Sequence, residues 1–263
     1  MNGKKRKAIL RKLRGKPCYI CGIIPEKEEL TADHLPPQGL SPHSPNSDFL
    51  LLPAHKSCNN MYSNQEEKFI AYLAFVCNGT GNASADAAWA GVERGFKRNE
   101  IGRAGAPSKD LLRLIENSTS VERFTQHGIY LGTSKFYWPS QDVNIEMIVG
   151  KIVRGLHYHH TKIVVPEHWK IRVELGQLSP QYILQTPIQN NLGDFFAYQG
   201  GYDETGSLWY MSIYRQAYAL VRIDDPEQGI EVLESHPYKL QHISDIFPQL
   251  RKYYNGDQQE STP

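Results

Sequence analysis

The sequence lacks any run of eighteen apolar residues, so no segment is long enough to cross a membrane as a helix. The first sixteen residues contain no acidic residue and no apolar stretch that resembles a secretory signal. We therefore expect a cytoplasmic protein in a reducing compartment, where cysteines bind metal more often than they form disulfides. No internal repeat is visible, and the net charge of +1 argues neither for nor against a polyanionic partner.

The composition is typical of a globular protein. The chain has 263 residues, of which 40% are hydrophobic and 11% aromatic, enough for a core of ordinary size in one or two domains. The first half contains several segments with helical spacing, and the second half contains one long helical segment followed by consecutive segments rich in aromatic and β-branched residues, so the sequence predicts the α+β class.

Two pairs of metal-binding residues stand near the N-terminus. Cys18 and Cys21 are separated by two residues, and the same gap separates His55 and Cys58. Four such ligands complete a tetrahedron around Zn²⁺, and a structural zinc ion stabilises a loop-rich segment that has little core of its own. The alternatives are unrelated buried thiols or disulfides, and the reducing compartment favours zinc. Cys77 lies in an apolar run and is predicted to be a small buried hydrophobic residue.

Three polar residues lie beside these ligands. Asp33 and His34 form a pair between the two sets, and Asn59 directly follows Cys58. This order resembles the HNH endonuclease family, whose ββα-metal motif runs from a ligand pair to an Asp-His strand, a loop, a second ligand pair and an Asn on a helix. The segment PAHKSCNNMYSNQEEKF is similar to the branch with Cys-x-x-Cys-Asn-Asn followed by Ser and paired Glu, with His55 in place of the first cysteine.

The resemblance implies a metal-dependent endonuclease that hydrolyses DNA and leaves 5′-phosphate and 3′-hydroxyl ends. His34 matches the general base, and Asp33 and Asn59 match the ligands of a catalytic Mg²⁺ or Mn²⁺ ion. Asp48 matches the residue that orients the base, usually an Asn in the family; the fallback candidates are Asn46, Asn60 and Glu66. Free-standing members of this length resemble bacterial or phage defence and restriction effectors.

Each of these residues also has a simpler interpretation. His34 precedes Leu-Pro-Pro and fits a turn histidine, and Asn59 fits a helix N-cap. The rival function is a non-catalytic zinc module that binds nucleic acid or protein. A third possibility keeps the enzyme and makes RNA its substrate.

A basic cluster precedes the first cysteine. As a helix or a flexible arm it would neutralise backbone phosphates, adding affinity without sequence preference, whereas the alternative is a solubilising tail. The cluster consists of Lys4, Lys5, Arg6, Lys7, Arg11, Lys12, Arg14 and Lys16.

We predict four segments. A basic arm at 1–16 precedes a nuclease domain at 17–125, in which the ββα-metal motif and zinc knuckle have a helical surround. The domain at 126–254 is α+β, with a helix packed on an antiparallel sheet, and its role is not predicted; a partner protein or effector is one candidate ligand. The tail at 255–263 is polar and predicted to fray.

Local patterns predict the elements of both halves. In the first half we expect strands at 28–34 and 49–52 and helices at 59–77, 83–96 (capped by Ser84) and 109–116. In the second half we expect a long helix through Ile145 and Leu156, and strands at 128–131, 135–138, 169–175, 182–186, 195–202, 208–214 and 217–223, the last three as an antiparallel meander.

The second half contains clustered histidines and aromatic residues. A second metal site at the histidines is less favoured than polar residues at a helix C-terminus. The aromatic residues, together with Arg154, fit either a base-stacking surface or a sheet face packed on a helix. The residues concerned are His157, His159, His160, His168, Tyr198, Tyr202, Trp209, Tyr210 and Tyr214.

Overall fold

The structure of the chain is a computed structural model, and it has the predicted α+β class. It describes residues 3–43, 49–100, 119–124, 130–136, 143–176, 188–203 and 206–226. The elements up to residue 100 are α1 (Gly3–Leu13), β1 (Leu30–Leu35), the 3-10 helix η1 (Gln38–Leu40), β2 (Leu50–His55), α2 (Lys56–Asn60), α3 (Ser63–Cys77) and α4 (Ala83–Glu100). The later elements are β3 (Thr119–Phe124), β4 (Tyr130–Phe136), α6 (Ile145–Thr161), β5 (Lys170–Gly176), β6 (Ile188–Leu192), β7 (Phe196–Tyr202), β8 (Gly206–Ile213) and β9 (Ala217–Asp224).

Strands β1 and β2 form an antiparallel pair that leads directly into helix α2. Leu30 pairs with His55 and His34 pairs with Leu51. The second strand is longer than predicted because it continues through Pro53, a residue that a strand edge tolerates. His55 therefore ends the strand and stands next to α2.

The helix predicted at 59–77 is two helices. The chain breaks at Met61 and Tyr62, so Asn59 lies within α2 and the N-cap position of that helix is His55. Helix α4 is capped by Asn82, whose Oδ1 accepts a hydrogen bond from the Ala85 amide at 3.0 Å, and the predicted cap Ser84 lies inside the helix.

The second half contains a five-stranded antiparallel sheet with the order β5-β9-β8-β7-β6. Strands β7, β8 and β9 form the predicted meander. Strand β6 was not predicted because its sequence, IQNNL, is mostly polar and its central residues are exposed. Strands β3 and β4 pair separately as a hairpin, and β4 is one continuous strand that spans the gap between the two strands predicted at 128–131 and 135–138.

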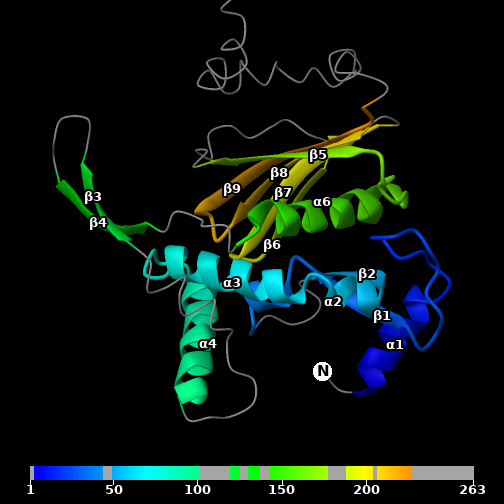
Figure 1. Cartoon of the computed structure of the whole chain (residues 1–263), viewed down its shortest axis with the longest axis horizontal. Coiled ribbons are helices and arrows are strands. Elements are labelled where there is room, and N and C mark those ends of the chain that lie inside the picture. Colours follow the sequence, from blue (N-terminus) through cyan, green and yellow to red (C-terminus); the bar gives the residue numbers. More distant parts are fainter. Residues whose placement is uncertain are drawn as a thin grey trace, which may run out of the picture.

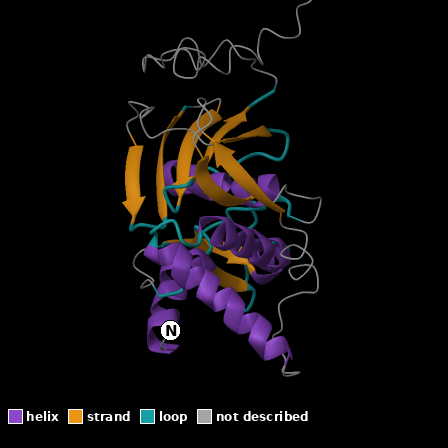
Figure 2. Ribbon diagram, turned by 90° about the vertical axis from the view of Figure 1, so that its left-hand side faces the viewer, coloured by secondary structure: helices purple, strands orange, loops and turns teal. Residues whose placement is uncertain are grey.

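Helix α6 lies between the sheet and the β1–β2 hairpin (Figures 1 and 2). One face packs on β5 and β9, and another packs on β1, β2 and α3. Asn144 caps the helix by accepting a hydrogen bond from the Met147 amide at 2.9 Å. The buried side chains of both halves belong to one core cluster. Helix α6 follows the domain boundary predicted at residue 126, and it is part of the core beneath the β1–β2 hairpin.

A polar cluster also joins the two halves. The Asn82 amide donates to the Asp194 carbonyl at 2.7 Å, and the Ser84 hydroxyl donates to the Asp194 carboxylate at 2.5 Å. The Tyr214 hydroxyl donates to the Leu40 carbonyl at 2.7 Å in a buried position. The two bonds to Asp194 hold the start of α4 against the turn between β6 and β7, and the bond from Tyr214 joins the end of β8 to η1.

Several predicted elements lie outside the described residues. They are the helix at 109–116, the strand at 182–186, the tail at 255–263, and parts of the strands at 128–131 and 135–138. Within the described ranges, no helix combines the length and hydrophobicity needed to span a membrane.

The contact between α6 and the hairpin can be tested at Gly155. A Cβ atom there would lie 2.9 Å from methyl carbons of Leu35 and Leu52, both buried. We expect Gly155→Val to lower the free energy of unfolding by about 1–3 kcal/mol in urea titrations, because the larger side chain overpacks this contact. Gly150→Ala on the same helix meets only ordinary contacts at 3.8 Å and should be neutral or stabilising by up to about 1 kcal/mol. Equal stability of the two variants would contradict this packing.

Candidate functional site

The four predicted zinc ligands converge on one point. Cys18 and Cys21 lie in the loop after α1, His55 ends β2, and Cys58 lies in α2. Their ligand atoms all lie within 4.8 Å of one another, and Nδ1 of His55 is 3.4 Å from Sγ of Cys21 and 3.9 Å from Sγ of Cys58. A tetrahedral zinc ion places sulfur and nitrogen ligands roughly 3.5–3.8 Å apart. The cluster therefore fits zinc, and it is the one such Cys/His/Asp/Glu group found among the described residues.

The thiols compete for protons. Burial raises the pKa of Cys18, but hydrogen bonds from the backbone of Cys21, His55 and Ile20 outweigh burial and lower it to about 7. Burial and the neighbouring Cys18 and Cys21 sulfurs raise the pKa of Cys58 to about 12. Three adjacent thiolates repel one another, and a bound divalent cation compensates their negative charge. Cys77 is buried outside the cluster, as predicted.

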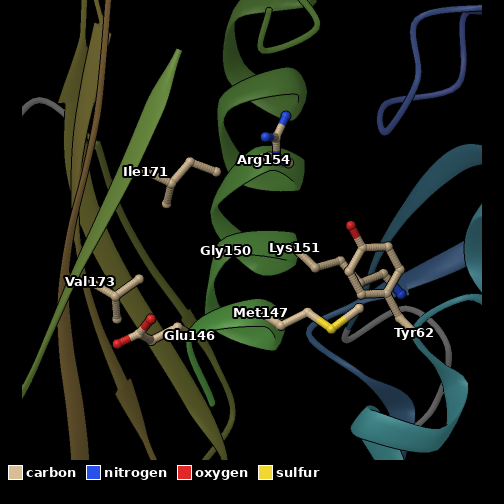
Figure 3. Close-up of a pocket in the computed structure, with 8 residues that line it drawn as sticks. All are labelled: Tyr62, Glu146, Met147, Gly150, Lys151, Arg154, Ile171 and Val173. Atoms are coloured by element: carbon tan, nitrogen blue, oxygen red, sulfur yellow. The ribbon is translucent and has the colours of Figure 1, made fainter. Parts of the chain in front are cut away.

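A second polar cluster lies beside the zinc ligands. The ammonium group of Lys151, from helix α6, contacts three side-chain oxygens: Asp33 Oδ2 at 2.8 Å, Asn59 Oδ1 at 3.1 Å and Glu66 Oε1 at 2.5 Å. The Lys151 side chain extends from α6 toward the ring of Tyr62, whose centroid is 5.2 Å from Nζ (Figure 3). The structure therefore brings Asp33 and Asn59 to the same cation.

This cluster is almost dry. The Lys151 side chain is 1% exposed, that of Asp33 8% and that of Glu66 18%. Burial lowers the pKa of Lys151, but the negative charges of Asp33 and Glu66 outweigh burial and raise it, so the amine stays protonated. Burial raises the pKa of Glu66 by more than the charge of Lys151 lowers it. Removing one partner from such a buried group typically costs about 3–5 kcal/mol of stability.

Tyr19 connects the two clusters. It follows the zinc ligand Cys18, and its backbone amide donates to the Pro53 carbonyl at 3.0 Å. Its hydroxyl donates to Oδ2 of Asp33 at 2.6 Å, and the side chain is fully buried. Burial raises the pKa of Tyr19 well above its ordinary value, so the hydroxyl remains a donor. The position of Asp33 thus depends on the segment that carries the zinc ligands.

His34 is half-buried beside Phe49. The two rings meet edge to face, with centroids 5.7 Å apart. Its Nε2 is buried and has no hydrogen-bond partner among the described residues. Burial lowers the pKa of His34, the charge of Asp33 opposes this and the charge of Lys151 adds to it, so the net shift is downward. The ring is therefore neutral at neutral pH and can accept a proton.

The residue predicted to orient His34, Asp48, lies outside the described residues, as does Asn46. Asn60 is exposed, and Glu66 pairs with Lys151. The sequence interpretation missed Lys151. One signal was available, because Lys151 stands three residues after the apolar Ile148 and directly before Ile152 and Val153, among the positions predicted for the core of the helix.

Most of the basic segment lies in helix α1, which has no acidic residue in its first turn, and Arg14 and Lys16 follow the helix. All the described basic side chains of this segment are exposed, whereas Leu13 is buried against the rest of the protein. The side chain of Lys4 lies outside the description. The exposed residues are Lys5, Arg6, Lys7, Arg11, Lys12, Arg14 and Lys16.

The histidines of the second half form no metal-binding group within the described residues. His157 Nδ1 is 3.1 Å from the Ser207 hydroxyl, and His160 stacks on Trp209. Burial lowers the pKa of both histidines to about 4, so they are uncharged near neutral pH and do not act as cations at the helix C-terminus.

Most of the aromatic residues on the sheet pack inside the protein. Tyr198, Trp209, Tyr210 and Tyr214 are buried, whereas Tyr202 is 42% exposed. The buried set fits the interpretation as a packed sheet face, and it is not a base-stacking surface.

No family model, no curated protein and no solved structure matches this chain.

The zinc site can be tested by removing one ligand. We expect Cys58→Ser to lose bound zinc, measured by elemental analysis, and to lower the melting temperature by roughly 10 °C or more, because a structural zinc ion contributes several kcal/mol to folding. Cys77→Ala is the matched control, because Cys77 is buried outside the cluster and should keep about one zinc per chain. Full zinc content in Cys58→Ser would contradict the assignment.

Proposed function

We propose that the chain is an HNH-type endonuclease that hydrolyses DNA phosphodiester bonds. The observation that carries the proposal is that the side-chain oxygens of Asp33 and Asn59 meet at the ammonium group of Lys151, next to the Cys3His cluster. Asp33 lies on β1, the strand that also holds His34. The order β1, β2, α2 agrees with the ββα motif of that family. The implied defence role rests on the family resemblance alone.

The oxygen donors fit a hard divalent cation. Mg²⁺ and Mn²⁺ prefer carboxylate and amide oxygens. Asp33 Oδ2 and Asn59 Oδ1 both lie about 3 Å from the Nζ atom of Lys151, so the two oxygens face the same position. When bound, such an ion supplies positive charge that stabilises the leaving oxygen of the scissile phosphate. Asp33 and Asn59 would hold it, and Tyr19 would orient Asp33 through its hydroxyl.

His34 would act as the general base. A neutral imidazole accepts a proton from the water that attacks phosphorus, and the lowered pKa of His34 keeps the ring neutral at neutral pH. The unpartnered Nε2 is the atom available for this proton.

A non-catalytic zinc module that binds nucleic acid is the second candidate. It is favoured by the position of Lys151, which fills the space between the proposed ion ligands, and by the burial of His34 Nε2. The exposed basic helix α1 serves both functions equally.

Replacing His34 separates the two functions. We expect His34→Ala to reduce Mg²⁺-dependent or Mn²⁺-dependent nicking of plasmid DNA by about 100-fold or more, because general bases contribute factors of this size. Zinc content and melting temperature should stay near the wild-type values. His43→Ala, at an exposed histidine, should keep full activity. Absence of nicking by the wild type, or equal nicking by His34→Ala, favours the binding module, and parallel digestion of duplex DNA, single-stranded DNA and RNA identifies the substrate.

The basic helix should bind phosphates. We expect Arg11→Gln combined with Lys12→Gln to weaken DNA binding equally for unrelated sequences, because phosphate contacts carry no sequence information. In fluorescence anisotropy the slope of log K against log salt should fall by about 0.9 for each lost contact. Lys27→Gln, at an exposed lysine outside α1, is the control. An unchanged slope in the double variant would identify the helix as a solubilising segment.

A further inference from the structure

We infer that Lys151 competes with a divalent cation for the site formed by Asp33, Asn59 and Glu66, and that the ion binds only when the lysine side chain moves away. This inference rests on the proposed cation site and adds its regulation. The geometry requires competition, because the ammonium nitrogen lies 2.5–3.1 Å from one oxygen of each of the three residues. An ion bound to the same oxygens would occupy the same space.

The charges favour the exchange. The site contains two carboxylates, Asp33 and Glu66, and Lys151 supplies a single positive charge. The ammonium therefore leaves one negative charge uncompensated, whereas a divalent ion balances both carboxylates. Charge balance matters strongly here because the site is nearly dry and electrostatic interactions there are only weakly screened. Glu66 becomes a third oxygen ligand in addition to the pair proposed above.

A neighbouring pocket offers the displaced side chain an alternative position. The pocket has a volume of about 210 Å³ and is lined by Lys151 itself, Tyr62, Arg154 and the exposed Glu146, among others. In Figure 3, Glu146 lies on the other side of α6 from Lys151 and Tyr62, so the displaced ammonium group would exchange the inner carboxylates for water. The flexible four-carbon stem of a lysine side chain allows this movement.

The competition places control of the ion site in the second half of the chain. Lys151 belongs to helix α6, which packs on β5 and β9 of the large sheet. A ligand that fills the pocket beside α6 would keep Lys151 in the ion site, and a change that draws the side chain outward would open the site. The apparent affinity for the ion is therefore the intrinsic affinity multiplied by the fraction of molecules in which Lys151 has left the site.

The first experiment compares ion binding by variants of the zinc-loaded protein. Free Mn²⁺ is measured by electron paramagnetic resonance during titration. We expect Lys151→Met to bind Mn²⁺ with a dissociation constant lower than that of the wild type by about tenfold or more, because the internal competitor is gone. Lys170→Met, at an exposed lysine on β5, removes the same charge from the surface and should bind like the wild type. Adding Asp33→Asn to Lys151→Met should abolish the gain.

The second experiment uses the wild type and does not depend on how the variant folds. Lysine acetylation with a reactive ester is followed by mass spectrometry, with and without saturating Mn²⁺. The Lys151 side chain is 1% exposed and should react slowly without Mn²⁺, and saturating Mn²⁺ should speed its labelling by about tenfold or more while Lys170 is unaffected.

The outcomes separate this inference from the proposed function. Equal Mn²⁺ affinity in wild type and Lys151→Met, absence of binding in both, or Mn²⁺ binding without faster labelling of Lys151 would overturn the competition. Tighter Mn²⁺ binding by Lys151→Met together with faster labelling would establish it even if neither protein cleaves nucleic acid, in which case the nuclease assignment alone fails.

Discussion

The ion pairs of Lys151 are the interaction on which the arrangement of the site depends. They hold together residues from β1, α2, α3 and α6, and they compensate charges that burial would otherwise make costly. Hydrophobic packing brings α6 against the hairpin, but it has no directional preference that would select one register. The ammonium group supplies that selection, because it must meet its carboxylates to be buried at all.

Two groups of contacts position the side chains of the site: the Cys3His group, and the contacts of Lys151 with Asp33, Asn59 and Glu66. The Cys3His group brings together the loop after α1, the end of β2 and the start of α2. Tyr19, in that loop, holds Asp33 through a short hydrogen bond, and Asn59 directly follows Cys58 in α2. The oxygens around Lys151 thus owe part of their positions to the segments that carry the Cys3His group.

The sequence predicted the features that local patterns encode. The spacing of four ligands predicted the Cys3His group, the helical period predicted α6, and the turns predicted the meander of β7, β8 and β9. Features set by distant contacts were missed. Asn82 caps α4 in place of Ser84 because its amide also bonds the β6–β7 turn, and β6 is polar because it is an edge strand. Lys151 was missed because its carboxylate partners, Asp33 and Glu66, are remote in sequence. The helical period of α6 shows which face is buried, but it does not show which side chains that face contacts.

The separation of Lys151 from its partners also has a consequence for synthesis. Glu66 and Lys151 are 85 residues apart in the chain, and Asn82 and Asp194 are 112 apart. At ribosomal rates, roughly 4 to 17 s pass between the emergence of Glu66 and that of Lys151. During that interval Asp33 and Glu66 lack the ammonium group that pairs with them in the folded protein. Burying the two carboxylates together is costly without that positive charge, so we expect this part of the site to close only after translation has delivered helix α6.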